Sequence, residues 1–384
     1  MRFEFATATR IVFGSGTCEE VPAAAMKMGR RGLLVTGANP RRAQPLREQL
    51  AAGGLHVASY GVDAEPTLDT VRDGACRAQQ ENCDVVIGFG GGSVLDTGKA
   101  IAALLTNGGD PLDYLEVIGR GKPLTAPAAP YIAIPTTAGT GAEVTRNAVL
   151  ASPEHRVKVS LRSPLMLPRL AVVDPRLTHG LPPSITASTG LDALTQLLEP
   201  FVSHQANPMT DAFCREGLPR VATSLVPAVQ DGGNAAARED MALASLFGGL
   251  ALANAKLGAV HGIAGPLGGM FPAPHGATCA ALLPHVMAVN MQALGQRQPE
   301  SEPLRRYQEV ARLLTRSETA TPADGAAWLE QLCRQLNILP LGSYGLTESH
   351  FPDLIEKASR ASSMKGNPIA LRDEELREIL SRAL

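Results

Sequence analysis

The segment DVVIGFGGGSVLDTGKAIAALL, residues 84–105, decides the fold of this 384-residue chain. Residues 84–90 form an apolar run that ends in glycine, which is typical of a buried strand, and residues 94–105 have the composition of a helix. The glycines between them expose backbone N–H groups where the dipole of the following helix favours an anion. The segment predicts a strand, loop and helix with a diphosphate on Gly90–Ser93; a glycine-rich turn without a ligand is the alternative.

The same alternation of strands and helices extends on both sides of this segment. Further strand patterns lie at 31–36, 56–62, 131–136 and 170–175, and further helical patterns lie at 41–52 and 67–80. This order predicts an α/β domain with a doubly wound, Rossmann-like parallel sheet. Residues 144–163 alternate around a turn at 152–155 and predict a hairpin attached to that domain.

From residue 181 onward the strand patterns stop and helical patterns replace them. These lie at 184–203, 208–230, 237–259, 277–294, 303–316, 322–336, 350–360 and 373–383. We therefore predict two domains, an α/β domain over residues 1–180 and an all-α domain over residues 181–384. The chain length agrees with two domains.

Composition excludes several classes of protein. The formal net charge is −2 and 45% of the residues are hydrophobic, so a core is available and no basic field indicates nucleic acid. The amino terminus has no signal-peptide pattern, and no stretch is expected to reach the about 18 apolar residues of a membrane helix. The six cysteines are scattered without a CxxC pair, which is typical of reduced thiols. We expect a cytoplasmic protein that binds neither nucleic acid nor membrane.

A second polar loop, PTTAGTGAEVT at residues 135–145, also follows a predicted strand. Four threonines and two glycines make it a hydrogen-bonding surface that a backbone or a ribose could approach. A turn rich in threonine, without a ligand, is the alternative.

The helical half contains a carboxylate in an apolar setting. Asp192 lies in TGLDALTQ, residues 189–196, and Gln196 lies four residues further on the same helical face. That face otherwise carries small or apolar residues. A buried aspartate there is unfavourable unless it is paired or ligates a cation.

Two histidines follow in VHGIAGPLGGMFPAPHG, residues 260–276. We expect a small-residue helix over 246–259 to deliver His261, a break at 265–269, and a turn at 272–274 that presents His275. Neutral imidazole is the commonest protein ligand for metals, and two imidazoles with Asp192 form a set suited to a divalent ion with an open position. The alternative is that both histidines only form hydrogen bonds at a junction between helix and turn.

Four ordered motifs, GGGSVLDTGKAIA, PTTAGTGAEVT, TGLDALTQLLE and the stretch with two histidines, resemble the iron-containing (group III) alcohol dehydrogenase family. The resemblance extends to Asn367-Pro368. It implies an oxidoreductase that uses NAD or NADP to interconvert an alcohol and an aldehyde or ketone, with a metal as Lewis acid on the substrate oxygen. It also implies a catalytic cleft between the two domains, and we expect a homodimer.

The resemblance implies that Asp192, His261 and His275 bind the metal and form the catalytic centre. Many family members carry a histidine where Gln196 stands, so Gln196 is at best a weak ligand. Many also carry a second histidine where Gly265 stands. The remaining set resembles the three-ligand zinc site of the glycerol dehydrogenase branch. We expect a divalent metal, zinc or iron, with zinc or a weakly held divalent ion preferred to tightly held iron.

The resemblance also implies where the cofactor binds. The pyrophosphate is expected on Gly90–Ser93, the nicotinamide half near the threonines of the second loop, and the ribose near Lys158. Gly37 stands where many members carry an aspartate that repels a 2′-phosphate, so we expect NADP to be accepted at least as well as NAD. The full set of expected contacts is Gly37, Gly90, Gly91, Gly92, Ser93, Asp96, Thr136, Thr137, Thr140, Thr145 and Lys158.

Lys256 stands where a small residue is usual in the family. We expect it to contact an anionic or polar group of the substrate; an ammonium group that reaches solvent is the alternative. Three other functions stay open at this stage: a metal-independent enzyme like maleylacetate reductase, a lyase like dehydroquinate synthase, and a non-catalytic binder that kept the fold.

Overall fold

The computed structural model describes residues 2–384, which divide into two compact units. The α/β unit comprises Ala6–Thr137 and Gly141–His179. The helical unit comprises the segment up to Phe5, Ala138–Thr140 and Gly180–Leu384.

The α/β unit is built on a six-stranded parallel sheet in the order β1-β8-β5-β4-β2-β3. The strands are β1 (Ile11–Phe13), β2 (Arg31–Gly37), β3 (His56–Val62), β4 (Val85–Gly90), β5 (Tyr131–Pro135) and β8 (Leu170–Val173). The predicted doubly wound parallel sheet is confirmed. Every residue of β4 is buried, which explains its continuous apolar sequence.

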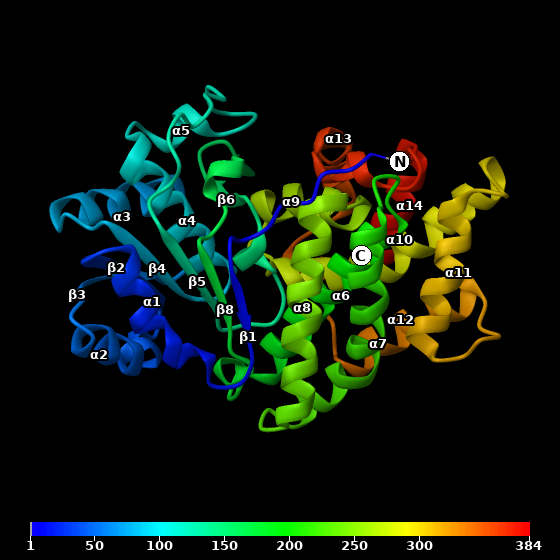
Figure 1. Ribbon diagram of the computed structural model, residues 1–384. Coiled ribbons are helices and arrows are strands. Elements are labelled where there is room, and N and C mark those ends of the chain that lie inside the picture. The colour runs from blue at the N-terminus through cyan, green and yellow to red at the C-terminus, as the bar shows by residue number, and fades with distance from the viewer. Residues whose placement is uncertain (1) are drawn as a thin grey trace. The chain divides into compact units, whose positions relative to one another are not determined.

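Helices cover both faces of this sheet (Figure 1). On one face Leu34 and Ile87 pack against α1 (Val21–Met28) and α2 (Gln44–Ala52). On the other face Leu33 and Val86 pack against α3 (Leu68–Gln80) and α4 (Gly92–Asn107). Neighbouring strand residues therefore point to opposite faces, and both faces are apolar.

The predicted hairpin is present as β6 (Asn147–Ser152) and β7 (Val157–Arg162), which pair antiparallel. A short helix, α5 (Pro111–Tyr114), precedes it in the chain. The fully buried Lys99 of α4 holds the start of the hairpin, because its Nζ donates to the carbonyl oxygens of Ala142 at 2.8 Å and Asn147 at 2.6 Å. Asp96, one turn earlier, forms an ion pair with Lys99 at 3.4 Å.

The helical unit places α6 against α7, α8 and α10 around one large apolar core. Its helices are α6 (Pro183–Val202), α7 (Pro208–Gln230), α8 (Ala235–Ala255), α9 (Ala259–Met270), α10 (His275–Arg297), α11 (Glu302–Thr315), α12 (Pro322–Gln335), α13 (Phe351–Arg360) and α14 (Asp373–Ala383). The predicted all-α second part is confirmed.

The break before His261 lies in a different place from the one predicted. Helix α8 ends at Ala255, and α9 begins at Ala259 and continues through the predicted break at 265–269. The two helices are bent by 97° across the break. The expectation of a helix over 246–259 was wrong because local glycines do not decide where the chain turns; groups from other elements stabilise the start of α9, as described below.

Among residues 2–384, α10 is the one helix long and apolar enough, by length and composition, to cross a membrane. The bent pair of α8 and α9 would also qualify if it were one span. The sequence expectation that no stretch reaches this limit was wrong for α10. Within the protein, 78% of the apolar part of α10 is buried, as in the core helix of a helical bundle.

Candidate metal centre

Helix α6 supplies the carboxylate of the site. Asp192, Gln196 and Glu199 follow one another at helical spacing on one face. All three are buried, and the Asp192 side chain is only 2% exposed. A polar stripe inside an apolar core indicates that these groups have partners there.

Helix α9 supplies His261 in its first turn. The first N–H groups of a helix have no partner within the helix. Here the N–H of Ala259 donates to Asn367 Oδ1 at 3.1 Å, and that of Val260 donates to Glu199 Oε1 at 2.6 Å. A Cβ on Gly258 would lie 3.0 Å from each of these oxygens, so glycine allows their close approach. These contacts fix where α9 begins.

Glu199 also orients the ring of His261. Its Oε2 lies 2.7 Å from Nδ1 of His261, which leaves Nε2 on the opposite side of the ring, 3.3 Å from Asp192 Oδ1. A carboxylate on the far nitrogen of a ligand histidine is a common arrangement at metal sites, where it fixes the tautomer and the ring orientation.

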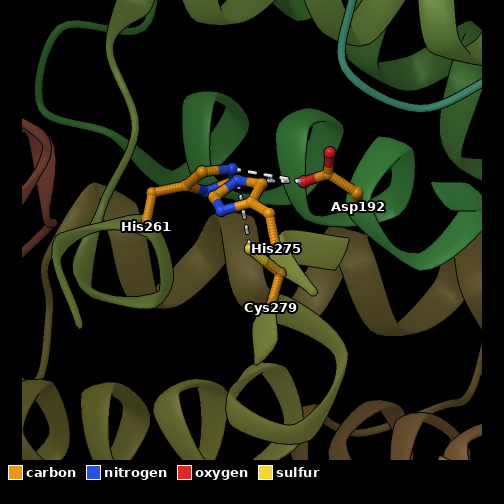
Figure 2. A group of neighbouring side chains, drawn as sticks. All are labelled: Asp192, His261, His275 and Cys279. Atoms are coloured by element: carbon orange, nitrogen blue, oxygen red, sulfur yellow. Dashed lines mark hydrogen bonds and ion pairs between the residues drawn. The ribbon is translucent and has the colours of Figure 1, made fainter. Parts of the chain in front are cut away.

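Helix α10 supplies two further groups, His275 at its first position and Cys279 one turn later. A Cβ on Gly276 would lie 2.5 Å from the carbonyl oxygen of Ser188, so this glycine lets α10 approach α6. His275 Nε2 then lies 3.9 Å from Asp192 Oδ1 and 3.7 Å from Cys279 Sγ. Figure 2 shows the two imidazoles with the Asp192 carboxylate to their right and the Cys279 sulfur below them.

The four groups form a compact cluster suited to a metal ion. One ligand atom from each of Asp192, His261, His275 and Cys279 lies within 4.8 Å of all the others. Within residues 2–384, Asp192 Oδ1, His261 Nε2 and Gln196 Oε1 are buried without a hydrogen-bond partner. Buried polar atoms are rarely left unsatisfied, and a divalent cation would satisfy the first two. The residues present therefore fit a metal.

Exposure differs between the two sides of the cluster. The side chains of Asp192 and His261 are 2% and 7% exposed, whereas that of His275 is 34% exposed. His275 therefore lies on the more exposed side of the cluster.

The electrostatics of the cluster favour positive charge. Burial disfavours the charged form of His261, but Cys279, Asp192 and Glu199 together raise its pKa well above the usual value. Cys279 and Asp192 likewise raise the pKa of His275 against the effect of burial. Burial favours the neutral acid at Asp192, but His261 and His275 outweigh it and lower the pKa. The carboxylates of Asp192 and Glu199 thus favour a positive charge at this position.

The structure brings the three predicted ligands together and adds two residues that sequence reasoning missed. Cys279 was grouped with the scattered cysteines, although its position four residues after His275 on a helix places both on one face. Glu199 had a comparable signal, seven residues after Asp192. Gln196 lies on the same face of α6 with its amide oxygen buried.

The predicted phosphate loop lies at the carboxyl end of the sheet. Gly90 ends β4, and α4 begins at Gly92, two residues earlier than predicted. Gly91 is the N-cap and has no side chain that could occupy the first N–H groups of the helix.

The second predicted loop lies next to the first. Thr136 is buried, and Thr137 lies beside Gly91: a Cβ added to Gly91 would be 3.3 Å from the Thr137 hydroxyl. Gly37 ends β2 at the same edge of the sheet.

Three of the expected cofactor residues have internal partners. Asp96 Oδ2 accepts from the backbone N–H of Val149 at 3.0 Å. The Thr145 hydroxyl accepts from Lys99 Nζ at 2.9 Å. Lys158 forms an ion pair with Glu65, and its side chain is 9% exposed. Ser93 is the second residue of α4, and Thr140 lies in the second predicted loop. That these side chains contact a cofactor stays a prediction.

The sequence predicted that Lys256 lies within a helix, but in the structure it does not. It follows the last residue of α8 with a φ of 61° and is exposed. The break between α8 and α9 explains its position.

Comparisons with known proteins agree with this architecture. Residues 8–175 match the family model for iron-containing alcohol dehydrogenase, and residues 186–384 match the model for the C-terminal part of the same family. The chain is 37% identical to 1,3-propanediol dehydrogenase of Klebsiella pneumoniae over 92% of each chain. It is 33% identical to the NAD-dependent methanol dehydrogenase of Bacillus methanolicus over 97% of each chain.

A crystal structure of a 1,3-propanediol oxidoreductase has the same fold, with a TM-score of 0.92, 34% sequence identity and complete coverage of both chains. The sheet, the helical unit and the candidate metal cluster occur in one chain that both family models match. The chain therefore belongs to the iron-containing alcohol dehydrogenase family and is an oxidoreductase of alcohols and aldehydes.

Proposed function

We propose that this chain interconverts short aliphatic alcohols or diols and their aldehydes, with NAD or NADP as cofactor and a divalent metal at Asp192, His261 and His275. Two relatives are named for 1,3-propanediol and methanol, which supports small, unbranched substrates. One of them is named as NAD-dependent, which supports a nicotinamide cofactor.

One observation carries the metal-dependent form of this proposal. Asp192 Oδ1 and His261 Nε2 face each other at 3.3 Å, buried, and neither has a hydrogen-bond partner within residues 2–384. Without a metal, the buried Asp192 carboxylate would depend on a protonated His261 for its charge partner, whereas a dication would accept the lone pairs of both atoms.

Each part of the chain would have a distinct task. The metal, when bound, would supply a Lewis acid for the substrate oxygen, and the nicotinamide would supply or accept the hydride. Asp192, His261 and His275 would hold the metal, and Glu199 would keep the His261 ring in position. The half-exposed side of His275 would admit the alcohol or aldehyde.

The cofactor would bind to the α/β unit. The N–H groups at Gly91–Ser93 lie at the start of α4, where they would donate to the pyrophosphate. Gly37 places no carboxylate at the end of β2, and Arg41 and Arg42 follow in the next turn, which supports acceptance of NADP as well as NAD. On the substrate side, Lys256 is exposed five residues before His261 and stays our candidate for a contact with a polar substrate group.

A redox assay tests the proposed reaction. Purified protein with excess NADH or NADPH should consume the cofactor on addition of propionaldehyde, and should form it on addition of 1,3-propanediol with NAD or NADP. A lyase related to dehydroquinate synthase would give no net change in reduced cofactor. A non-catalytic binder would hold the cofactor without turnover, and either result would refute the proposal.

A further inference from the structure

Cys279 is a buried thiol placed against ligand nitrogens. Its residue is 0% exposed, and its Sγ lies 3.7 Å from Nε2 of His275. It lies within 4.8 Å of a ligand atom of each of the other three members of the cluster. Buried cysteines often serve only as small apolar side chains, so this position needs to be compared with an ordinary core cysteine.

Cys214 of α7 provides that comparison. It is also 0% exposed and belongs to the same apolar core. The sulfur of Cys279 faces an imidazole, with Nε2 of His275 at 3.7 Å, whereas Cys214 packs within the apolar core. Two equally buried cysteines of one unit therefore differ in their surroundings, and only Cys279 belongs to the cluster of possible metal ligands found among residues 2–384.

The distances between the side chains agree with four-fold coordination. Zinc bonds of about 2.0 to 2.3 Å in a tetrahedron separate ligand atoms by about 3.3 to 3.6 Å. The separations here are 3.3 Å between Asp192 Oδ1 and His261 Nε2, 3.9 Å between Asp192 Oδ1 and His275 Nε2, and 3.7 Å between His275 Nε2 and Cys279 Sγ. The other three pairs of ligand atoms lie within 4.8 Å of each other, so side-chain movements of about 1 Å would bring all four atoms onto one ion.

Gln196 is the other side chain that could fill the fourth position, since its amide oxygen is buried without a partner among residues 2–384. It offers only a neutral oxygen, whereas Cys279 can bind as an anionic thiolate, which is a stronger ligand for a dication.

We infer that Cys279 is the fourth protein ligand of the metal centre and that its thiolate makes the site prefer zinc, or another thiophilic dication, to iron. The inference rests on the proposed metal-dependent function. On binding, the S–H bond breaks, the proton leaves to solvent, and a bond from sulfur to the metal forms without any change of oxidation state. Thiolate is a softer ligand than imidazole or carboxylate, so it adds more to the affinity for zinc than for Fe²⁺.

Cobalt(II) gives a direct readout that does not depend on activity. Metal-free protein loaded with Co²⁺ should show an intense near-ultraviolet absorption from charge transfer between thiolate and cobalt. Cys279→Ser should lose this band and keep the weaker visible bands of cobalt bound by oxygen and nitrogen. Cys214→Ser, which places the same hydroxyl in an equally buried position, should keep the charge-transfer band.

Competition with a chelator measures the preference between metals. Loss of a residue that hydrogen-bonds to a metal ligand lowers metal affinity by about 10- to 100-fold. Loss of a direct ligand in Cys279→Ser should therefore lower the affinity for Zn²⁺ by at least about 100-fold. The affinity for Fe²⁺, measured under anaerobic conditions, should fall by less. Cys279→Asp keeps the charge but replaces sulfur with oxygen. It should restore binding without the charge-transfer band and shift the preference towards iron. Circular dichroism and urea unfolding of the metal-free forms show whether each variant is folded.

The results separate this inference from the proposed function. A charge-transfer band that is absent from the wild type, or that persists in Cys279→Ser, would overturn the role of Cys279. Alcohol oxidation without the band would leave the proposed function intact and remove only the fourth ligand. A wild type with the band but without alcohol oxidation would retain the ligand and refute the function.

Discussion

At the scale of single residues, Glu199 connects two parts of the metal centre. One of its oxygens accepts from the start of α9 and the other lies 2.7 Å from the ring of His261. Its charge is also placed at the N terminus of a helix, where the dipole favours an anion. Glu199 therefore positions the ligand His261 but is not itself a proposed metal ligand.

Replacing Glu199 with glutamine should weaken metal binding. The amide keeps the shape of the side chain but removes the charge that fixes the His261 ring, so we expect about 10- to 100-fold lower affinity for Zn²⁺. Chelator competition measures the change. Glu309→Gln, the same substitution at an exposed pair with Arg215, is the control and should leave the affinity unchanged. Equal affinities in the wild type and in Glu199→Gln would contradict the role given to this carboxylate.

Gly37 allows a direct test of cofactor choice. A Cβ at this position would meet only Val94, at 3.9 Å, which is ordinary contact, so an aspartate fits. Gly37→Asp should raise the KM for NADP at least about tenfold, because a carboxylate would repel the 2′-phosphate, and should change the KM for NAD by less than about twofold. Gly37→Asn, of the same shape without the charge, is the control. A wild-type preference for NAD over NADP above about a hundredfold would contradict the expectation that NADP is accepted at least as well as NAD.

At the scale of elements, the bend between α8 and α9 decides where His261 lies. Asn367, far along the chain, accepts from the N–H of Ala259 and from Asn290 Nδ2, both at 3.1 Å, and donates to Asn290 Oδ1 at 2.8 Å. The buried pair of asparagines thereby connects the start of α9 with α10. The positions of both histidine helices depend on it.

Asn367→Ala should loosen both histidine helices. It would leave the N–H of Ala259 and the side-chain oxygen of Asn290 unsatisfied and buried, so we expect a loss of about 2 to 4 kcal/mol in the free energy of unfolding. Urea denaturation measures this loss. The double substitution with Asn290→Ala should destabilise less than the sum of the two single changes, because both remove the same hydrogen bonds. Additive losses would show that the two residues act independently.

The elements differ in how far the sequence predicts them. The strands β2, β4 and β5 were predicted within one or two residues, because buried parallel strands have continuous apolar sequences. Helix α7 was predicted with its observed bounds, since Asn207 caps it through the N–H groups of Met209 and Thr210.

The break at 256–258 was not predictable, because the groups that stabilise it belong to Glu199 and Asn367. Cys279 was missed for a similar reason: its role depends on α6 and α9 as well as on its own helix.

At the scale of the whole molecule, one buried carboxyl should shape the dependence of stability on pH. Burial raises the pKa of Glu143 from 4.5 to about 7. Between these values the unfolded chain releases a proton that the folded chain keeps, so the free energy of unfolding falls as the pH rises through this window and levels off above about 7. A shift of one pKa unit corresponds to about 1.4 kcal/mol.

Glu143→Gln should remove this contribution. Relative to the wild type, the variant should gain about 2 to 3 kcal/mol between pH 5 and pH 8. Urea unfolding at both values measures the difference. Glu116→Gln, at an exposed position of the same unit, is the control and should follow the wild type. A gain that is the same at pH 5 and pH 8 would contradict a titrating Glu143.

The central claim, that the chain is an alcohol dehydrogenase whose activity requires a metal at Asp192, His261 and His275, is tested most directly by titrating the stripped enzyme with metal. The rate of NAD(P)H consumption with a short aldehyde is followed while Zn²⁺ is added to protein freed of metal by chelation, with His261→Ala beside it. We predict no turnover before addition, a linear rise that saturates at one bound ion per chain, and no rise in His261→Ala. Full turnover by the metal-free protein, unchanged in His261→Ala, would contradict the account and favour a metal-independent reductase.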